Sequence, residues 1–199
     1  TLKTKFIGKT IEYFPVIGST NEEARKYLAA REGIVLVADR QTEGKGRLGR
    51  KWFSPSGGLY FSVILKPRKA PKDLYKLTIM AAVACVRAIK EKTGLPVTIA
   101  PPNDIMLDKK KVGGILAEGA TRGKDSGIII GVGINIKRQK FPSPIKDTAV
   151  SLEGKIARDR LLKSILAEIE CWYLKFLNND FTECMVEYES FGGKRSIKH

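Results

Sequence analysis

The chain has few cysteines, one histidine and no long apolar run, and each scarcity excludes a class of protein. Cys85, Cys171 and Cys184 are an odd number without the spacing of a metal site, which argues against a disulfide scaffold or a zinc domain. We expect all three to be reduced packing residues. The single histidine, His199, ends the chain and receives no catalytic role. No apolar run could cross a bilayer and no signal-peptide core begins the chain, so we expect a cytoplasmic protein without a membrane partner.

Length and charge narrow the classes further. The 199 residues suffice for one domain with a buried core, and a hydrophobic content of 43% is ordinary for a globular protein. The net charge of +15 raises the question of a nucleic-acid partner. Basic residues mix with glutamates, as at 22–26, which is typical of solvated helix faces, and no nucleic-acid-binding motif is found. We therefore predict an anionic substrate and an acidic protein partner, with no specific nucleic acid.

A glycine- and arginine-rich segment is the most informative part of the chain. It runs from Gly44 to Trp52 and reads Gly-Lys-Gly-Arg-Leu-Gly-Arg-Lys-Trp. Apolar runs at 34–38 and 59–65 flank it, which predicts a loop between two buried strands. Glycines let main-chain amides approach a ligand and guanidinium groups pair with phosphate oxygens, so we expect an anionic ligand here. A solvated basic turn is the alternative, and the spacing is not that of a Walker phosphate loop.

Hydrophobic periodicity predicts an α+β domain without internal repeats. Besides the two strands beside the loop, helices are expected at 20–30, 74–92, 159–177 and 181–188, and strands at 97–99, 104–107, 112–120 and 127–135. Polar turns join the last strands into a meander. Ser19 and Glu22 have capping-box spacing, so Ser19 has a structural interpretation besides a ligand-binding one. The elements predict a mixed, mostly antiparallel sheet with helices packed on one face.

Four motifs in order resemble those of biotin protein ligases. The glycine-arginine segment and the strand after it resemble that family's GRGRxGRxW motif. Residues 102–105 and 111–118 resemble its KWPND and K-x-x-G-I-L-x-E motifs, and 131–135 resemble G-x-G-I-N. Ser19-Thr20-Asn21 stands where the family keeps a biotin-contacting STN. The chain thus resembles the catalytic domain of the biotin/lipoate protein ligase superfamily, which implies a fold like that of class II aminoacyl-tRNA synthetases.

The resemblance implies ATP-dependent joining of biotin to a lysine of a biotin carboxyl carrier protein through biotinyl-5′-AMP. A carboxylate cannot expel hydroxide, so ATP must first activate it, and cations must neutralise the phosphate charge. The implied catalytic residues are Lys111, Arg47 and Arg50, and the implied ATP-binding residues are Arg47, Arg50, Trp52, Asn103, Lys111 and Asn135. Asn103 and Asp104 are the candidate Mg²⁺ ligands, because hard cations prefer oxygen, with an Asx turn as the structural alternative.

Biotin requires hydrogen-bond partners for its ureido ring and apolar walls for its remainder. The residues implied for biotin are Ser19, Thr20, Asn21, Gln41, Gly44, Lys45, Gly46, Arg47, Trp52, Lys111, Gly113 and Gly114. Asn135 would offer a donor and an acceptor to adenine, with Gly131 and Gly133 leaving room for the ring. A core position is the alternative for Trp52, and a β-bulge is the alternative for the strand glycines.

The chain departs from the family pattern where Ala100 and Pro101 replace Lys-Trp. The lost charge and aromatic wall keep two alternatives open: a degenerate ligase that only binds biotin or its adenylate, and a lipoate or octanoate ligase. Residues 1–188 are expected to form the catalytic domain, and 189–199 to resemble the start of a C-terminal SH3-like barrel, without a preceding DNA-binding domain. The sequence leaves open the acceptor protein, a homodimer and the affinities.

Overall fold

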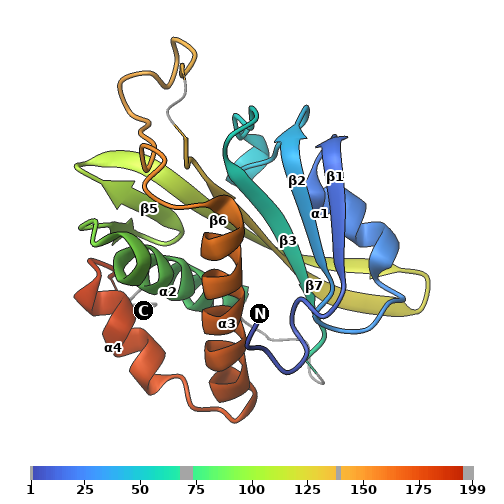
Figure 1. Cartoon of the computed structure of the whole chain (residues 1–199). Helices are drawn as coiled ribbons and strands as arrows, with labels where there is room; N and C mark the ends of the chain where they lie inside the picture. Colours follow the sequence, from blue (N-terminus) through green and yellow to red (C-terminus); the bar gives the residue numbers. More distant parts are fainter. Residues whose placement is uncertain (1, 68–73, 138–139, 195–199) are drawn as a thin grey trace.

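The computed structural model describes residues 2–67, 74–137 and 140–194, so His199 and the end of the expected barrel segment lie outside the described residues. A seven-stranded sheet in the order β1-β2-β3-β7-β6-β5-β4 forms the centre of the fold (Figure 1). The strands are β1 (Ile11–Ile17), β2 (Val35–Gln41), β3 (Leu59–Leu65), β4 (Thr98–Ala100), β5 (Asp104–Leu107), β6 (Lys110–Arg122) and β7 (Asp125–Ile134). Only β1 and β2 are parallel among these neighbours, so the predicted mixed, mostly antiparallel sheet is confirmed.

Strand β1 escaped the sequence prediction because it lies at the edge of the sheet. Three of its apolar side chains, Ile11, Tyr13 and Val16, are 44%, 51% and 56% exposed, so the strand lacks a clear buried alternation. Pro15 also argues against a strand on sequence alone. An edge strand tolerates proline because one row of its amides needs no partner in the sheet.

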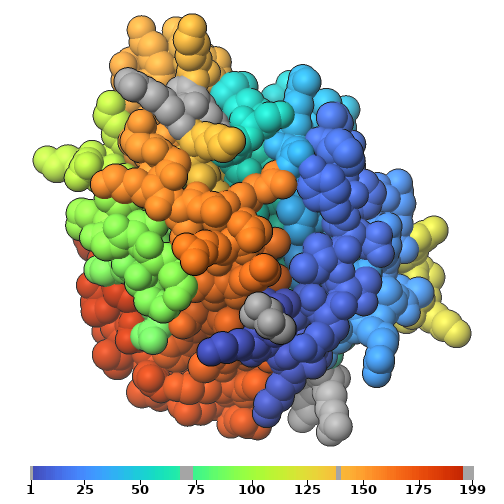
Figure 2. Space-filling view, viewed as in Figure 1, coloured from blue at the N-terminus to red at the C-terminus, as the bar shows by residue number. Residues whose placement is uncertain are grey.

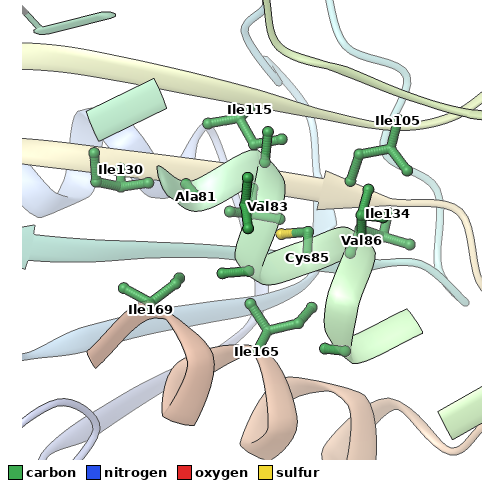
Figure 3. Close-up of a cluster of buried hydrophobic side chains, with 14 of the residues drawn as sticks. Ala81, Val83, Cys85, Val86, Ile105, Ile115, Ile130, Ile134, Ile165 and Ile169 are labelled. Atoms are coloured by element: carbon green, nitrogen blue, oxygen red, sulfur yellow. The ribbon is translucent and has the colours of Figure 1, made fainter. Parts of the chain in front are cut away.

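Three helices cover one face of the sheet: α2 (Leu74–Thr93), α3 (Arg158–Leu177) and α4 (Thr182–Ser190). Figure 3 shows α2 between sheet residues such as Ile115 and α3 residues such as Ile165. Its buried residues therefore surround most of its circumference, whereas the sequence pattern suggested one apolar face. Within the described residues, no helix is both long and apolar enough to span a membrane.

The cysteines only partly follow the expected packing role. Cys85 of α2 and Cys184 of α4 are buried, and burial raises the pKa of the Cys184 thiol to about 12. Cys171 of α3 is exposed, so the prediction that it packs in the core is wrong. Apolar neighbours in the sequence of a helix do not show whether a given residue lies on the buried or the exposed face of that helix.

The other face of the sheet carries the short helix α1 (Thr20–Ala24), which continues as a 3-10 turn over Arg25–Tyr27. Ala24 and Leu28 pack there against Leu36, Ile64 and Ile129. The single helix predicted over 20–30 is thus shorter and changes its winding. Ser19 precedes α1 but its side chain makes no capping hydrogen bond, so the capping-box interpretation is wrong.

The N-terminal segment is fastened to α3. Figure 2 shows the first residues, in dark blue, lying beside the orange and red helical part of the surface. Glu170 of α3 is 5% exposed and accepts hydrogen bonds from the backbone amides of Lys5, Phe6 and Ile7. Three donors converge on one buried carboxylate, which compensates for its removal from water.

Candidate active site

Glycines on two neighbouring strands, β6 and β7, leave an open floor on the α1 side of the sheet. The strand register places Gly131 of β7 between Ser62 of β3 and Leu116 of β6, and Gly133 opposite Gly114. A Cβ atom on Gly131 would lie 2.2 Å from Asn21 Oδ1, and one on Gly133 would lie 2.4 Å from Trp52 Nε1. These glycines therefore admit Asn21 and Trp52. Both glycines also line the cavity described next, and the room that they would leave for an adenine ring stays a prediction.

A cavity of about 250 Å³ lies over this floor, near the lower end of ligand-site volumes, roughly 300–1,000 Å³. Most residues predicted for biotin, ATP or Mg²⁺ line it: Ser19, Thr20, Asn21, Gln41, Lys45, Gly46, Arg47, Arg50, Trp52, Asn103, Asp104, Lys111, Gly114 and Asn135. Segments distant in the sequence are thus brought together at one place. Trp52 is half-buried in this wall, so its alternative core position is not observed.

Two predicted glycines do not line this cavity. Gly113 points to the opposite side of β6, where an added Cβ would lie 3.2 Å from Ile105 Cδ1 and from Ile134 Cγ1. A register shift of β5 against β6 lies beside it, in line with the bulge alternative. Gly44 is buried behind the loop, where a Cβ would lie 2.5 Å from Ser54 Oγ. Both glycines serve backbone packing, and neither lies in the cavity as predicted.

A chain of polar contacts fixes one end of the cavity. Gln41 Oε1 accepts a hydrogen bond of 2.8 Å from the Thr20 amide and lies 3.1 Å from Thr20 Oγ1. Gln41 Nε2 donates to Ser54 Oγ at 2.9 Å. The Gln41 side-chain amide therefore has a defined orientation, with its oxygen toward α1 and one Nε2 proton left for another acceptor.

Lys111 occupies the other end of the cavity. Its Nζ lies 2.7 Å from Asp104 Oδ1 and 5.2 Å from the centre of the Trp52 ring. Both charged side chains are about one-third exposed, at 33% and 34%. An ammonium held by one carboxylate and an aromatic face retains donors for an incoming anion.

The glycine-arginine loop is folded against these elements. Its ends pair through a bridge between Lys45 and Lys51, and a 3-10 turn, η2 (Arg47–Gly49), forms its tip. Arg47 Nη1 donates to Asn103 Oδ1 at 3.0 Å, and Lys45 Nζ contacts Glu22 Oε1 at 2.7 Å. These contacts anchor both sides of the loop, so it is more than a solvated basic turn.

The two predicted Mg²⁺ ligands do not form a ready metal site. Asn103 Oδ1 is occupied by Arg47, and Asn103 Nδ2 donates to the Ile115 carbonyl at 2.9 Å. Asp104 Oδ1 pairs with Lys111. Throughout the described residues, no group of three or more His, Cys, Asp and Glu side chains could hold a metal ion. The side chains as arranged do not fit a resident ion.

Asn135 presents half of the pair predicted for adenine. It is 3% exposed, and its Nδ2 donates to the Val150 carbonyl at 3.0 Å. Its Oδ1 is buried and has no hydrogen-bond partner in the part of the chain that the structure describes. A buried acceptor without a partner is costly, which indicates a place for a ligand donor.

Several lining or supporting residues escaped the sequence prediction. Ser62 and Glu118 contact Asn21, and both stand inside the quoted motifs, where regular strand alternation would have placed them on the Asn21 face. The segment 141–149 adds Phe141, Ile145, Thr148 and Ala149 to the cavity wall. Its sequence carries no helix or strand periodicity, so only its backbone contacts to Lys111 reveal this position.

The chain belongs to the biotin/lipoate A/B protein ligase family, whose model matches residues 13–135. Among curated relatives, the bifunctional ligase/repressor BirA of Bacillus subtilis is 38% identical over 96% of this chain and 62% of its own length. The biotin–[acetyl-CoA-carboxylase] ligase of Paracoccus denitrificans is 34% identical over 69% of this chain and 60% of its own length. The chain thus spans less than two-thirds of both relatives.

A solved relative extends the similarity to three dimensions. The biotin protein ligase of Aquifex aeolicus in complex with biotin and ATP superposes with a TM-score of 0.83 at 36% identity. The match covers 92% of this chain and 78% of that chain. The fold is that of the biotin protein ligases.

Proposed function

We propose that the chain catalyses ATP-dependent ligation of biotin to a lysine of a protein. The observation that carries this proposal is the position of Lys111, whose Nζ faces the cavity between Asp104 and Trp52. Arg47 and Arg50 line the same cavity. Cations gathered in a partly enclosed site favour a reaction in which negative charge accumulates on a phosphate.

In the first half-reaction, a biotin carboxylate oxygen attacks the α-phosphorus of ATP, and the bond to pyrophosphate breaks. Lys111 can donate to the carboxylate and to an α-phosphate oxygen, since an ammonium carries three donors. Arg47 and Arg50 would hold phosphate oxygens with their planar forks. Asn135 Oδ1 would accept from the adenine amino group, because its nitrogen is already bound to Val150.

In the second half-reaction, a neutral lysine amine of the acceptor attacks the acyl carbon of biotinyl-5′-AMP. The acyl–phosphate bond breaks, AMP leaves, and the amine loses a proton. The intermediate hydrolyses if water reaches it, so the loop at 44–52 and Trp52 would act as a cover. No covalent bond to the enzyme is required in either step.

We propose biotin as the substrate, in place of lipoate or octanoate, because one end of the cavity is polar. Thr20, Asn21 and Gln41 line it with oriented donors and acceptors, which a ureido ring needs and an alkyl chain does not. The Paracoccus relative is named for a carboxylase, so we propose a biotin carboxyl carrier protein as the acceptor. Mg²⁺ would accompany ATP, held chiefly by phosphate oxygens.

We also propose that the ligase is active, in place of a degenerate protein that only binds biotin or its adenylate. Neither Ala100 nor Pro101 lines the cavity, and Pro101 is exposed at the turn between β4 and β5. The two residues that depart from the family motif therefore lie outside the cavity wall. Arg47, Lys111 and Asn135 all remain in that wall.

The test measures pyrophosphate release with ATP and biotin, lipoate or octanoate in parallel reactions, with Mg²⁺ present. Of the three acids, we expect only biotin to cause pyrophosphate release. The biotinyl group should then be transferred to a biotin carboxyl carrier domain. Release with lipoate or octanoate and none with biotin would establish the lipoate-ligase alternative. Biotin binding measured by calorimetry without pyrophosphate release would establish the degenerate alternative.

A further inference from the structure

Asn21 is held from both sides, and two of the residues that hold it, Ser62 and Glu118, do not line the cavity. It is 3% exposed and rests on the bare Cα of Gly131. Its Nδ2 donates to Glu118 Oε2 at 2.7 Å and lies 3.4 Å from the Leu116 carbonyl. Its Oδ1 lies 2.6 Å from Ser62 Oγ. The amide is therefore enclosed by one carboxylate, one carbonyl and one hydroxyl.

These neighbours allow one orientation of the Asn21 amide. A carboxylate and a carbonyl can only accept hydrogen bonds, so the Asn21 nitrogen must face them. A flipped amide would place Oδ1 against Glu118, where two acceptors repel. Asn21 Oδ1 can only accept, so Ser62 Oγ, which lies 2.6 Å away, is its donor.

The second oxygen of Glu118 has a weaker contact. Arg25 Nη2, from the 3-10 turn that follows α1, lies 3.5 Å from Glu118 Oε1. Both protons of Asn21 Nδ2 are engaged, whereas Oδ1 has used one of its two lone pairs. Asn21 lines the cavity, so the group it can offer a ligand is an acceptor.

We propose that Glu118 and Ser62 are positioning residues that fix Asn21 as a hydrogen-bond acceptor and so select a ligand with an N–H group at that point. A ureido ring carries two such N–H groups, whereas lipoate and octanoate carry none at their distal ends. The proposal rests on the proposed function and adds residues that need not touch biotin. The proposal explains why the Glu118 carboxylate, on strand β6, lies beside the buried side-chain amide of Asn21.

The test compares Glu118→Gln and Ser62→Ala with the unaltered protein. A glutamine can donate or accept, so the flipped orientation of Asn21 no longer meets the closer of its two acceptors, and an alanine at position 62 leaves Asn21 Oδ1 without its donor. Each variant should weaken biotin binding about tenfold by calorimetry, the effect of roughly one hydrogen bond. The KM for biotin should rise together with the biotin Kd, while the KM for ATP stays unchanged. A general loss of folded protein would not change one KM and leave the other unchanged.

Two further measurements separate positioning from simple damage. An analogue methylated on both ureido nitrogens should lose affinity strongly for the unaltered protein and little for Glu118→Gln. The double variant should lose less affinity than the sum of the single variants, because both residues act through Asn21. Glu23→Gln is the control. Glu23 lies on α1, the helix of Asn21, and pairs with Lys26, so its replacement should leave the biotin Kd unchanged.

The outcomes distinguish this proposal from the proposed function. Biotin binding that is unchanged in both single variants would overturn the positioning role and leave the ligase function standing. An unaltered protein that binds no biotin would overturn both. If Ser62→Ala fails to fold, Glu118→Gln decides alone, since Glu118 is partly exposed and its replacement leaves the core intact.

Discussion

Arg47 Nη1 donates a 3.0 Å hydrogen bond to Asn103 Oδ1, which ties the glycine-arginine loop to the turn between β4 and β5. The loop would have to open for ATP and biotin to enter a cavity of about 250 Å³. Asn103 therefore holds the loop of the free protein near the position in which it would cover a ligand.

We expect Asn103→Ala to loosen the loop. Trypsin should cut after Arg47 or Arg50 several-fold faster in this variant than in the unaltered protein when no ligand is present. Biotin with ATP should slow the cutting in both, because bound phosphate gives the arginines a new partner. Arg122→Ala, on the distant hairpin where Arg122 bonds the Lys26 carbonyl, should not change cutting at the loop. Equal loop cleavage in Asn103→Ala and the unaltered protein would argue against this latch.

Replacing Lys111 should remove most adenylate formation. We expect Lys111→Ala to lower the rate of pyrophosphate release by roughly 10²–10³-fold, the typical effect of deleting one electrostatic stabiliser. Lys110→Ala is the control, because Lys110 is exposed where β6 begins. Near-normal release from Lys111→Ala, with a large loss from Lys110→Ala, would show that the motif is aligned one residue out of register.

The contact between Lys45 and Glu22 should be visible in a pH titration. The hydrogen bond from Lys45 lowers the pKa of Glu22 below its ordinary value of 4.5. The stabilisation from this pair is therefore present above pH 4.5 and is lost as the pH falls through the lowered pKa of Glu22. We expect the carboxyl carbon resonance of Glu22 to titrate below pH 4.5, and Lys45→Ala to move the midpoint upward. A midpoint that Lys45→Ala leaves in place would mean that the pair does not form in solution.

Glu170 should be important for stability. Glu170→Gln places an amide where three backbone donors converge, so at least one donor loses its acceptor. We expect the free energy of unfolding to fall by about 2–4 kcal/mol, as for other buried charged groups that lose a partner. Urea denaturation measures the change, and Glu168→Gln, whose side chain is partly exposed and pairs with Arg87, should cost much less. Equal losses in the two variants would refute the special role of Glu170.

The sequence predicted much of the fold because its signals are local. The apolar run at 59–65 became β3 with every residue buried, and the pattern at 159–177 became α3 within one residue. Strand β1 and the segment 141–149 were missed because neither repeats with a helix or strand period. Their positions follow from the strands and loops that they contact.

The ordered motifs of the sequence determined the family and most of the residues around the cavity, since each motif keeps its own residues together in the chain. Only the tertiary structure decided which of these residues face the cavity. Gly113 and Gly114 are adjacent in sequence, yet strand alternation turns one toward Ile105 and the other toward Trp52. Asn21 and Glu118 are 97 residues apart, and only the packing of α1 on β3 and β7 brings their side chains together. Hydrogen bonds depend on distances of a few ångströms, and such distances between remote residues exist only after the chain has folded.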